Sequence, residues 1–201
     1  MSEDAYHAYK GVKFRVEFLG RAPPSDRRVE ELKRWCRIFA EKNLAPPYEG
    51  GSYGNLSFRM SSGSDSFIIT GSKIGLKDSL TNDCFVRIEK IDMKNGVVHA
   101  EGSREPSSES MVHYAIYQHR PEVNAIFHGH CAEITACTSR LGIPETCREE
   151  PYGTIQLVER VVEIVNDGDF FQMKNHGFVS LGKTMDAAGD LTLEKLKMCR
   201  K

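Results

Sequence analysis

Two histidines lie two positions apart in segment 124–130, which reads Asn-Ala-Ile-Phe-His-Gly-His. The segment is typical of a β-strand, in which residues two apart project from the same face. The imidazoles of His128 and His130 can therefore point at one position in space, whereas Cys131 would face the other side. Two converging imidazoles suit a divalent metal ion, above all zinc. Two ordinary histidines at a strand end are the alternative, and the pair alone does not exclude it.

Two residues elsewhere in the chain strengthen the metal interpretation. A catalytic zinc ion has three protein ligands and keeps one position open for water or substrate. His176, within Asn-His-Gly, would supply a third nitrogen, and Glu109 is a candidate carboxylate ligand that moves aside for substrate. A turn histidine bonded to the backbone is the alternative for His176. His113 follows Glu109 by four residues on the same helical face, and either supports the site or is an ordinary packed histidine.

A second group of residues is suited to binding an anion. The serine pair 107–108 precedes a helical pattern, and a helix start offers free N–H groups and the positive end of the helix dipole. The Gly-Asn pair at 54–55 and the Thr-Gly pair at 70–71 combine close backbone approach with a polar side chain. Helix capping and ordinary turns are the alternatives. The candidate phosphate-binding residues are Gly54, Asn55, Thr70, Gly71, Ser107 and Ser108.

Composition restricts the class of protein. The 201 residues are 40% hydrophobic and 27% charged, with a net charge of -1. These values predict a soluble globular protein with a single domain over residues 1–201. The near-neutral charge gives no support for nucleic-acid or membrane binding, and no apolar run is long enough to span a bilayer. The polar N-terminus and six scattered cysteines predict a cytoplasmic protein with mostly reduced thiols.

The elements that must position these residues follow from periodicity. Alternation and apolar runs predict strands over 12–18, 53–59, 67–70, 85–93, 97–100, 123–130, 170–174 and 178–181. Helical spacing predicts helices over 25–43, 107–119, 132–139, 152–166 and 184–199, after a loose tail over 1–11. Several short strands pass without a long helix between them, which favours antiparallel pairing. We therefore expect an α+β fold with helices around a mainly antiparallel sheet.

Seven short motifs occur in the order in which they occur in the class II aldolase/adducin family. The chain resembles that family over about residues 28 to 197. The motifs are Gly54-Asn55-Leu56-Ser57, Ile69-Thr70-Gly71, Pro106-Ser107-Ser108-Glu109, Arg120-Pro121-Glu122-Val123-Asn124-Ala125, His128-Gly129-His130, Tyr152-Gly153-Thr154 and Asn175-His176-Gly177. Each motif is weak, but seven of them in order give a specific resemblance.

The resemblance implies a fold, a site and a reaction. The fold is a three-layer αβα arrangement, assembled as a C4 homotetramer with active sites near subunit interfaces. The zinc ligands correspond to His128, His130 and His176, the acid–base group to Glu109, and the phosphate pocket to the six residues named above. The implied reaction is retro-aldol cleavage of a small-molecule ketose phosphate. Zinc acts as a Lewis acid that stabilises the enediolate, and Glu109 moves the proton.

The chain departs from the zinc-dependent L-fuculose-1-phosphate aldolases of this family in segment 141–151, at position 129 and in its brief tail after the last predicted helix. Those enzymes carry a tyrosine in a longer segment before the Tyr-Gly-Thr motif, whereas residues 141–151 are short and contain no tyrosine. Gly129 also stands where the fuculose enzyme has asparagine. Two alternatives therefore remain open. One is dehydration, epimerisation or decarboxylation on the same zinc site, and the other is a non-catalytic, adducin-like binding domain.

Overall fold

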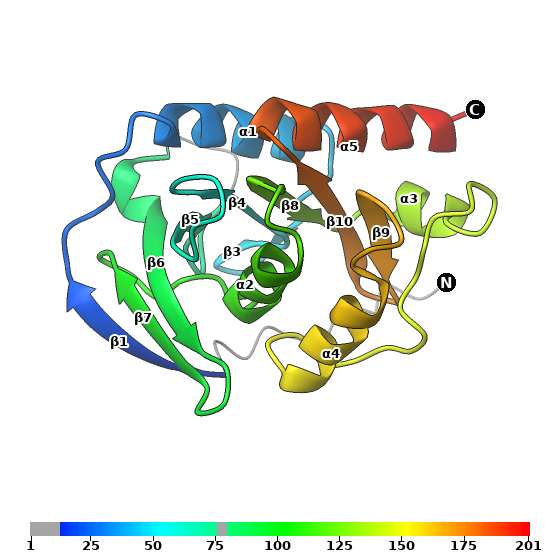
Figure 1. The fold of residues 1–201 in the computed structure, drawn as a ribbon. Helices are drawn as coiled ribbons and strands as arrows, with labels where there is room; N and C mark the ends of the chain where they lie inside the picture. Colours follow the sequence, from blue (N-terminus) through cyan, green and yellow to red (C-terminus); the bar gives the residue numbers. More distant parts are fainter. Residues whose placement is uncertain (1–12, 76–79) are drawn as a thin grey trace.

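The computed structural model describes residues 13–75 and 80–201. The tail predicted over residues 1–11, and Val12 at the start of the first predicted strand, lie outside the described residues. An eight-stranded sheet runs through the molecule with helices on both faces (Figure 1). This arrangement confirms the predicted α+β fold. In the described part of the chain, no helix combines the length and apolarity needed to cross a membrane.

The sheet is antiparallel except at one edge. Its strands follow the order β1-β7-β6-β5-β4-β8-β10-β9, and only the pair β1–β7 is parallel among the strand pairs described. The strands are β1 Arg15–Gly20, β4 Asn55–Arg59, β5 Phe67–Thr70, β6 Phe85–Asp92, β7 Val97–Glu101, β8 Ala125–Gly129, β9 Phe170–Met173 and β10 Gly177–Gly182. A separate small hairpin pairs β2 Pro47–Tyr48 with β3 Gly51–Ser52.

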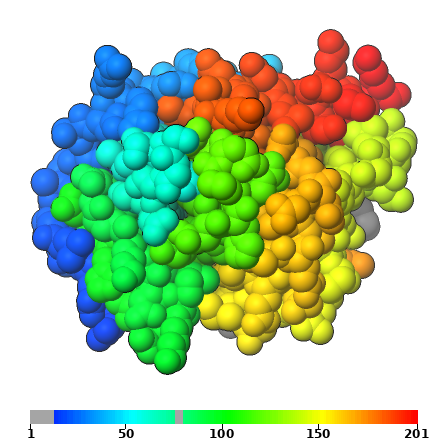
Figure 2. All heavy atoms as spheres, viewed as in Figure 1, coloured from blue at the N-terminus to red at the C-terminus, as the bar shows by residue number. Residues whose placement is uncertain are grey.

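Helices cover both faces of the sheet. Helices α1 Val29–Glu41 and α5 Met185–Cys199 lie side by side on one face, with the short α3 Ala132–Cys137 near the C-terminal end of α5 (Figure 1). Helices α2 Ser110–His119 and α4 Ile155–Ile164 pack together on the other face. Figure 2, in the same view, shows α5 in orange and red along the upper edge beside the blue α1. The molecule is thus built in three layers.

Two apolar cores separate these layers. One packs α2 and α4 against the sheet, and the other packs α1 and α5 against the opposite face. The apolar stripe predicted for α1 is confirmed, since Leu32, Trp35 and Phe39 are at most 2% exposed. Ile155, the first residue of α4, is 39% exposed, whereas Leu157, Val158 and Val161 of the same helix are buried.

The strand register places the site residues together. In the antiparallel pair β4–β8, Asn55 lies directly opposite His128, and in β8–β10 His128 lies opposite Val179. Directly opposite residues in a sheet share a face. The side chains of Asn55 and His128 therefore lie together on the face that α2 covers.

One pair of cysteines departs from the expectation of reduced thiols. Cys137 at the end of α3 and Cys199 at the end of α5 form a disulfide, with Cα atoms 5.6 Å apart. Packing of α3 against α5 brings the two Cα atoms within the range that a disulfide bridges. The sequence alone does not show this proximity, because the two cysteines are 62 positions apart. The described free cysteines are Cys36, Cys84, Cys131 and Cys147.

Candidate metal and anion site

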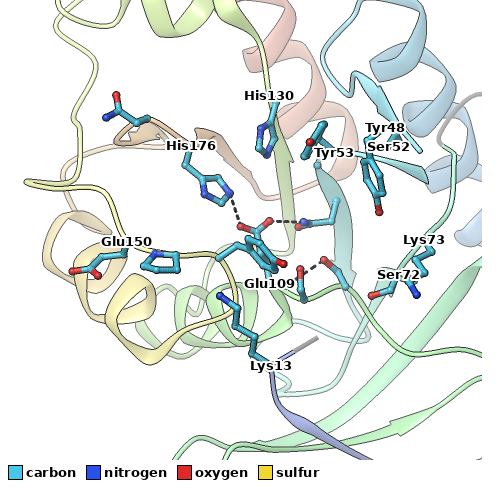
Figure 3. Close-up of a pocket in the computed structure, with 18 of the residues that line it drawn as sticks. Lys13, Tyr48, Ser52, Tyr53, Ser72, Lys73, Glu109, His130, Glu150 and His176 are labelled. Carbon is cyan, nitrogen blue, oxygen red and sulfur yellow. Dashed lines mark hydrogen bonds and ion pairs between the residues drawn. The ribbon is translucent and has the colours of Figure 1, made fainter. Parts of the chain in front are cut away.

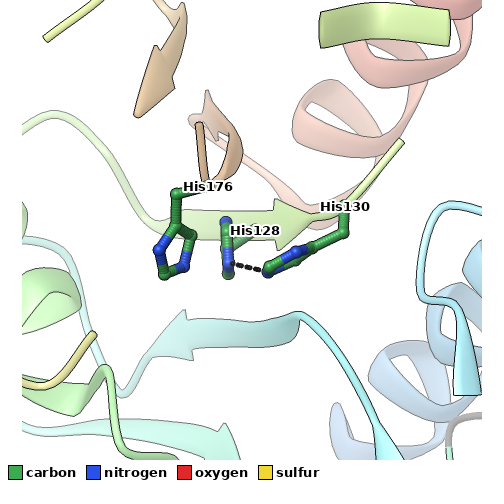
Figure 4. Close-up of side chains that lie close together, drawn as sticks. All are labelled: His128, His130 and His176. Atoms are coloured by element: carbon green, nitrogen blue, oxygen red, sulfur yellow. Dashed lines mark hydrogen bonds between the residues drawn. The ribbon is translucent and has the colours of Figure 1, made fainter. Parts of the chain in front are cut away.

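The structure brings the three predicted histidine ligands together (Figure 4). His128 lies on β8, His130 follows the end of that strand, and His176 lies in the turn between β9 and β10. Their ligand nitrogens all lie within 4.8 Å of one another. The Nε2 atoms of His128 and His130 are 3.1 Å apart. Residues distant in the sequence thus converge on one point.

Glu109, at the start of α2, contacts two of these three histidines. It occupies the N-cap position of α2 and is 5% exposed. Its Oε2 lies 3.1 Å from His128 Nε2, and its Oε1 lies 2.8 Å from His176 Nε2. Asn55 Nδ2 donates to Glu109 Oε2 over 2.7 Å (Figure 3). The carboxylate is therefore held by the imidazoles and by an amide.

The donor set fits a tetrahedral divalent ion. His128 Nδ1 lies 2.7 Å from the carbonyl oxygen of Phe178 and must donate to it, because a carbonyl only accepts. In the neutral form of this ring, which is the form that binds metal, the lone pair is at Nε2, facing His130 Nε2. A tetrahedral ion with bonds of about 2.0 Å separates its ligand atoms by about 3.3 Å. The 3.1 Å between the Nε2 atoms of His128 and His130 is close to this value, and all three ligand nitrogens lie within 4.8 Å of one another. His128, His130 and His176 could hold such an ion, with the Phe178 carbonyl orienting the first ring.

Burial and neighbouring charges shift the pKa values of Glu109 and His130. Burial alone would raise the pKa of the Glu109 carboxyl, but the rings of His128 and His176 outweigh it and hold that pKa well below its usual range. Burial lowers the pKa of His130 well below its ordinary value, and the neighbouring His128 lowers it further. His130 is therefore neutral, and a neutral imidazole is the form that binds metal.

Gly129 is required where β8 passes its neighbours closely. A Cβ at this position would lie 2.5 Å from Phe178 Cζ and 2.6 Å from the Leu44 carbonyl oxygen. His130 N donates to that same carbonyl over 2.8 Å. A side chain at position 129 would thus displace the backbone between His128 and His130.

We expect Gly129→Ala to weaken metal binding at least tenfold and to lower the melting temperature, because the backbone at His128 and His130 must shift to relieve both contacts. Zinc titration and thermal unfolding measure these effects. The matched control is Gly75→Ala, whose added Cβ meets nothing within 4 Å. Unchanged zinc affinity in Gly129→Ala would show that this close packing does not set the geometry of the cluster.

The cluster opens into a cavity of about 700 Å³ that also contains most of the predicted anion site (Figure 3). Its lining includes Gly54, Asn55, Gly71, Ser107, Ser108, Glu109, His130 and His176. Thr70 is not one of the described lining residues. Its hydroxyl accepts from Leu56 N over 3.3 Å, and its carbonyl accepts from Ser107 N over 3.1 Å. Thr70 therefore joins the loops of the anion site through its backbone.

Hydrogen bonds within the loops decide which groups an anion could use. The Ser107 amide is already bonded to Thr70, and the Ser107 hydroxyl oxygen accepts from Glu109 N over 3.3 Å. The hydroxyl of Ser107 acts here as a cap, and its hydrogen stays available to a ligand. The Asn55 amide is directed to Glu109. Asn55 therefore links the predicted anion site to the predicted metal site.

Several lining residues were not predicted from the sequence as site residues. Lys13 and Lys73 line the cavity, and the Nζ of Lys13 lies 4.3 Å from the ring centroid of Tyr152. Tyr53 stacks near His130, with ring centroids 5.0 Å apart. The sequence places Lys13 on the outward side of an alternating strand, so it carries no local signal of this role. Only the path of the chain brings it to the cavity.

The segment 141–151 also contributes to this wall. Glu149 and Glu150 line the cavity, and Asn175 Nδ2 donates to Glu149 Oε2 over 2.9 Å. Asn175 precedes His176 of the histidine cluster and has a positive φ of 54°. The segment that lacks the family's tyrosine thus carries two carboxylates at the cavity and a contact to the histidine turn.

Comparison with known proteins shows which family the chain is similar to. The family model described as Class II Aldolase and Adducin N-terminal domain matches residues 30–200. An L-fuculose phosphate aldolase of Methanococcus maripaludis is 31% identical over 156 residues, which is 70% of this chain and 79% of that protein. A 3-oxo-tetronate 4-phosphate decarboxylase of Pectobacterium atrosepticum is 27% identical over 75% of this chain and 73% of its own length.

Solved structures agree with the observed fold. A structure of L-fuculose 1-phosphate aldolase superposes with a TM-score of 0.71 at 23% sequence identity. The superposition covers 88% of this chain and 84% of that one. At this level of identity the likeness concerns the three-layer fold.

Proposed function

The chain belongs to the class II aldolase and adducin family, and from that premise we propose that it is a metal-dependent carbon–carbon lyase acting on a sugar phosphate. One observation carries the proposal most directly. Glu109 contacts His128 and His176 of the histidine cluster, in the wall of the cavity that also contains Ser107 and Ser108. A metal cluster, a carboxylate and an anion site that share one cavity suit a phosphorylated carbonyl substrate.

The metal of this proposal is zinc, held by His128, His130 and His176. The convergence of three imidazole nitrogens within 4.8 Å of one another supports zinc, and imidazoles suit other divalent ions as well. When bound, such an ion supplies Lewis acidity that polarises the substrate carbonyl. Glu109 would add a fourth donor at the edge of the cluster in the absence of substrate.

Glu109 is the acid–base group. Its carboxylate takes or returns the proton at the carbon next to the carbonyl, the carbon at which the bond to the second product breaks. Asn55 fixes the direction of one carboxylate oxygen by donating to Oε2. Since Glu109 is 5% exposed, bulk water competes little for this proton.

The phosphate of the substrate is placed at the start of α2. Gly54, Asn55, Gly71, Ser107 and Ser108 are the binding residues of the proposal, and Thr70 anchors Ser107 through its carbonyl. Binding of the phosphate holds the reacting carbons in register with the metal and with Glu109. Lys73 lies on the same wall and adds positive charge that favours an anionic substrate.

We expect purified protein to contain about one zinc ion per chain and to release an aldehyde from at least one ketose 1-phosphate, because the site combines a Lewis acid with a base. Elemental analysis measures the metal, and a dehydrogenase-coupled assay over a set of ketose phosphates measures the aldehyde. Chelation should abolish release, and added zinc should restore it. A chain that holds no metal in excess zinc would contradict the proposal and favour a binding role like that of adducin.

Decarboxylation of a phosphorylated oxo acid is the second candidate. The relative named as a 3-oxo-tetronate 4-phosphate decarboxylase supports it, and this reaction would use the same metal and phosphate sites. Release of carbon dioxide without aldehyde would identify this reaction. Assembly as a homotetramer is also part of the proposal, and light scattering after size-exclusion chromatography measures it.

A further inference from the structure

A line of polar contacts joins strand β4 to helix α2 within the apolar interior. We call it the α2–β4 seam, and its members are Asn55, Ser57 and Arg59 of β4 and Glu109, His113 and Tyr117 of α2. Residues two apart on a strand share a face, and so do residues four apart on a helix. The seam therefore consists of two rows of polar side chains that face each other.

Hydrogen bonds connect the two rows from the site inward. Asn55 Nδ2 donates to Glu109 Oε2 over 2.7 Å at the end next to the histidines. One turn further along the helix, Ser57 Oγ lies 2.7 Å from His113 Nδ1 and 2.9 Å from the Tyr117 hydroxyl. Ser57, His113 and Tyr117 are each at most 1% exposed. The seam thus consists of two buried hydrogen-bonded groups, Asn55–Glu109 next to the histidines and Ser57–His113–Tyr117 further inward, which are joined through the backbones of β4 and α2.

Arg59 anchors the far end of the seam. Its Nη2 donates to the carbonyl oxygens of Tyr117 over 2.7 Å and of Arg120 over 3.0 Å. The guanidinium carbon also lies 4.4 Å from the ring centroid of Tyr117. Carbonyls at a helix C-terminus lack partners within the helix, so this arginine satisfies them. Helix α2 is therefore bound to β4 at its start, its middle and its end.

Helix α2 needs such directional contacts to keep its position. Every residue from Ser110 to Tyr117 is buried, so apolar neighbours surround the helix on most sides. Apolar contacts have no preferred direction and oppose a small slide or rotation only weakly. Hydrogen bonds weaken steeply with misalignment, and a buried polar group left unpaired is costly. The seam is the feature that fixes the register of α2 on β4.

We propose that Ser57, His113 and Tyr117 are positioning residues, which hold the Glu109 carboxylate against the histidine cluster by fixing α2 on β4. The inference rests on the proposed function, in which Glu109 is the acid–base group. Among the described residues that line the cavity, none of these three is present. They therefore act through the helix and not by touching substrate.

The test removes single polar atoms from the seam. Tyr117→Phe and Ser57→Ala each delete a hydroxyl and leave the fold's apolar contacts in place. Tyr114→Phe is the control for a lost tyrosine hydroxyl on the same helix, since Tyr114 is 8% exposed, against 1% for Tyr117, and is not a member of the seam. Ser180→Ala is the control for a buried serine, whose Oγ donates to the Ala188 carbonyl over 2.8 Å.

The first measurement is exchange of the C–H protons of dihydroxyacetone phosphate, the smallest ketose phosphate, into deuterated water. Displacement of a catalytic carboxylate by about 1 Å costs about 100-fold in rate. We expect kcat to fall about 10- to 100-fold in both seam variants, with little change in KM. Placed in a Glu109→Gln background, Tyr117→Phe should cause no further loss, because both changes act on the same group. A loss that adds fully to that of Glu109→Gln would overturn the proposal.

The second measurement does not depend on turnover and decides the outcome. Protein loaded with Co²⁺ alone gives an absorption spectrum that responds to the ligands around the ion. We expect the spectra of Tyr117→Phe and Ser57→Ala to move toward that of Glu109→Gln, while Tyr114→Phe and Ser180→Ala keep the spectrum of the unaltered protein. Seam variants with the unaltered spectrum, or a Glu109→Gln spectrum that does not differ, would overturn the proposal. If the unaltered protein neither cleaves a ketose phosphate nor exchanges its protons, the proposed function fails. The Co²⁺ spectra still test whether the seam positions Glu109.

Discussion

Glu109→Gln is expected to retain its metal and to lose most of its turnover, by about 10²- to 10⁴-fold, the range for removing a general acid or base. The amide has the shape of the carboxylate, and its oxygen can still accept from Asn55 Nδ2, which donates over 2.7 Å. It cannot take a proton from carbon. The expected loss is therefore in kcat, and zinc content should stay near that of the unaltered protein. Steady-state kinetics and elemental analysis on the same preparation measure both quantities.

The control for this substitution is Glu105→Gln, an exposed carboxylate four residues before Glu109. It removes the same charge from the same segment without touching the histidine cluster, and its kcat should be unchanged. Near-normal proton exchange in Glu109→Gln would show that another group is the base. The cavity carries two further carboxylates, Glu149 and Glu150, which would then be the next residues to substitute.

His128→Ala is expected to abolish tight metal binding and, with it, all metal-dependent turnover. His128 is 1% exposed and contacts His130, Glu109 and the Phe178 carbonyl at once. Loss of an outer partner of a ligand already costs about 10- to 100-fold in affinity or activity. Loss of the ligand itself should exceed that range. Competition with a chromophoric chelator measures the zinc dissociation constant.

His99→Ala is the matched control for a lost imidazole. His99 lies on β7, where its Nδ1 is 3.3 Å from Glu17 Oε2 at the edge of the sheet. Its removal should leave zinc affinity and turnover unchanged. If His128→Ala bound zinc as tightly as His99→Ala, the three histidines would not be the metal ligands, and the lyase proposal would lose its basis.

The sequence by itself determined the local elements and the family. Strand β5 spans Phe67–Thr70 as predicted, and the apolar stripe of α1 is buried as predicted. The pairing of His128 with His130 on one face also follows from the sequence, because the two-residue period of a strand is a property of neighbouring residues. Seven motifs in order identified the family because they mark positions along the chain and require no knowledge of contacts.

Only the tertiary structure decided what surrounds Glu109. The hydrogen bond from Asn55 to Glu109 joins residues 54 positions apart, and it depends on the register in which Asn55 lies opposite His128. The parallel pairing of β1 and the approach of Lys13 to the cavity depend on the path of the chain. Periodicity fixes which side of an element a residue faces, but not which other element covers that side. Packing of the helices against the sheet decides which element covers that side, and it therefore decides which residues contact Glu109, the candidate acid–base group.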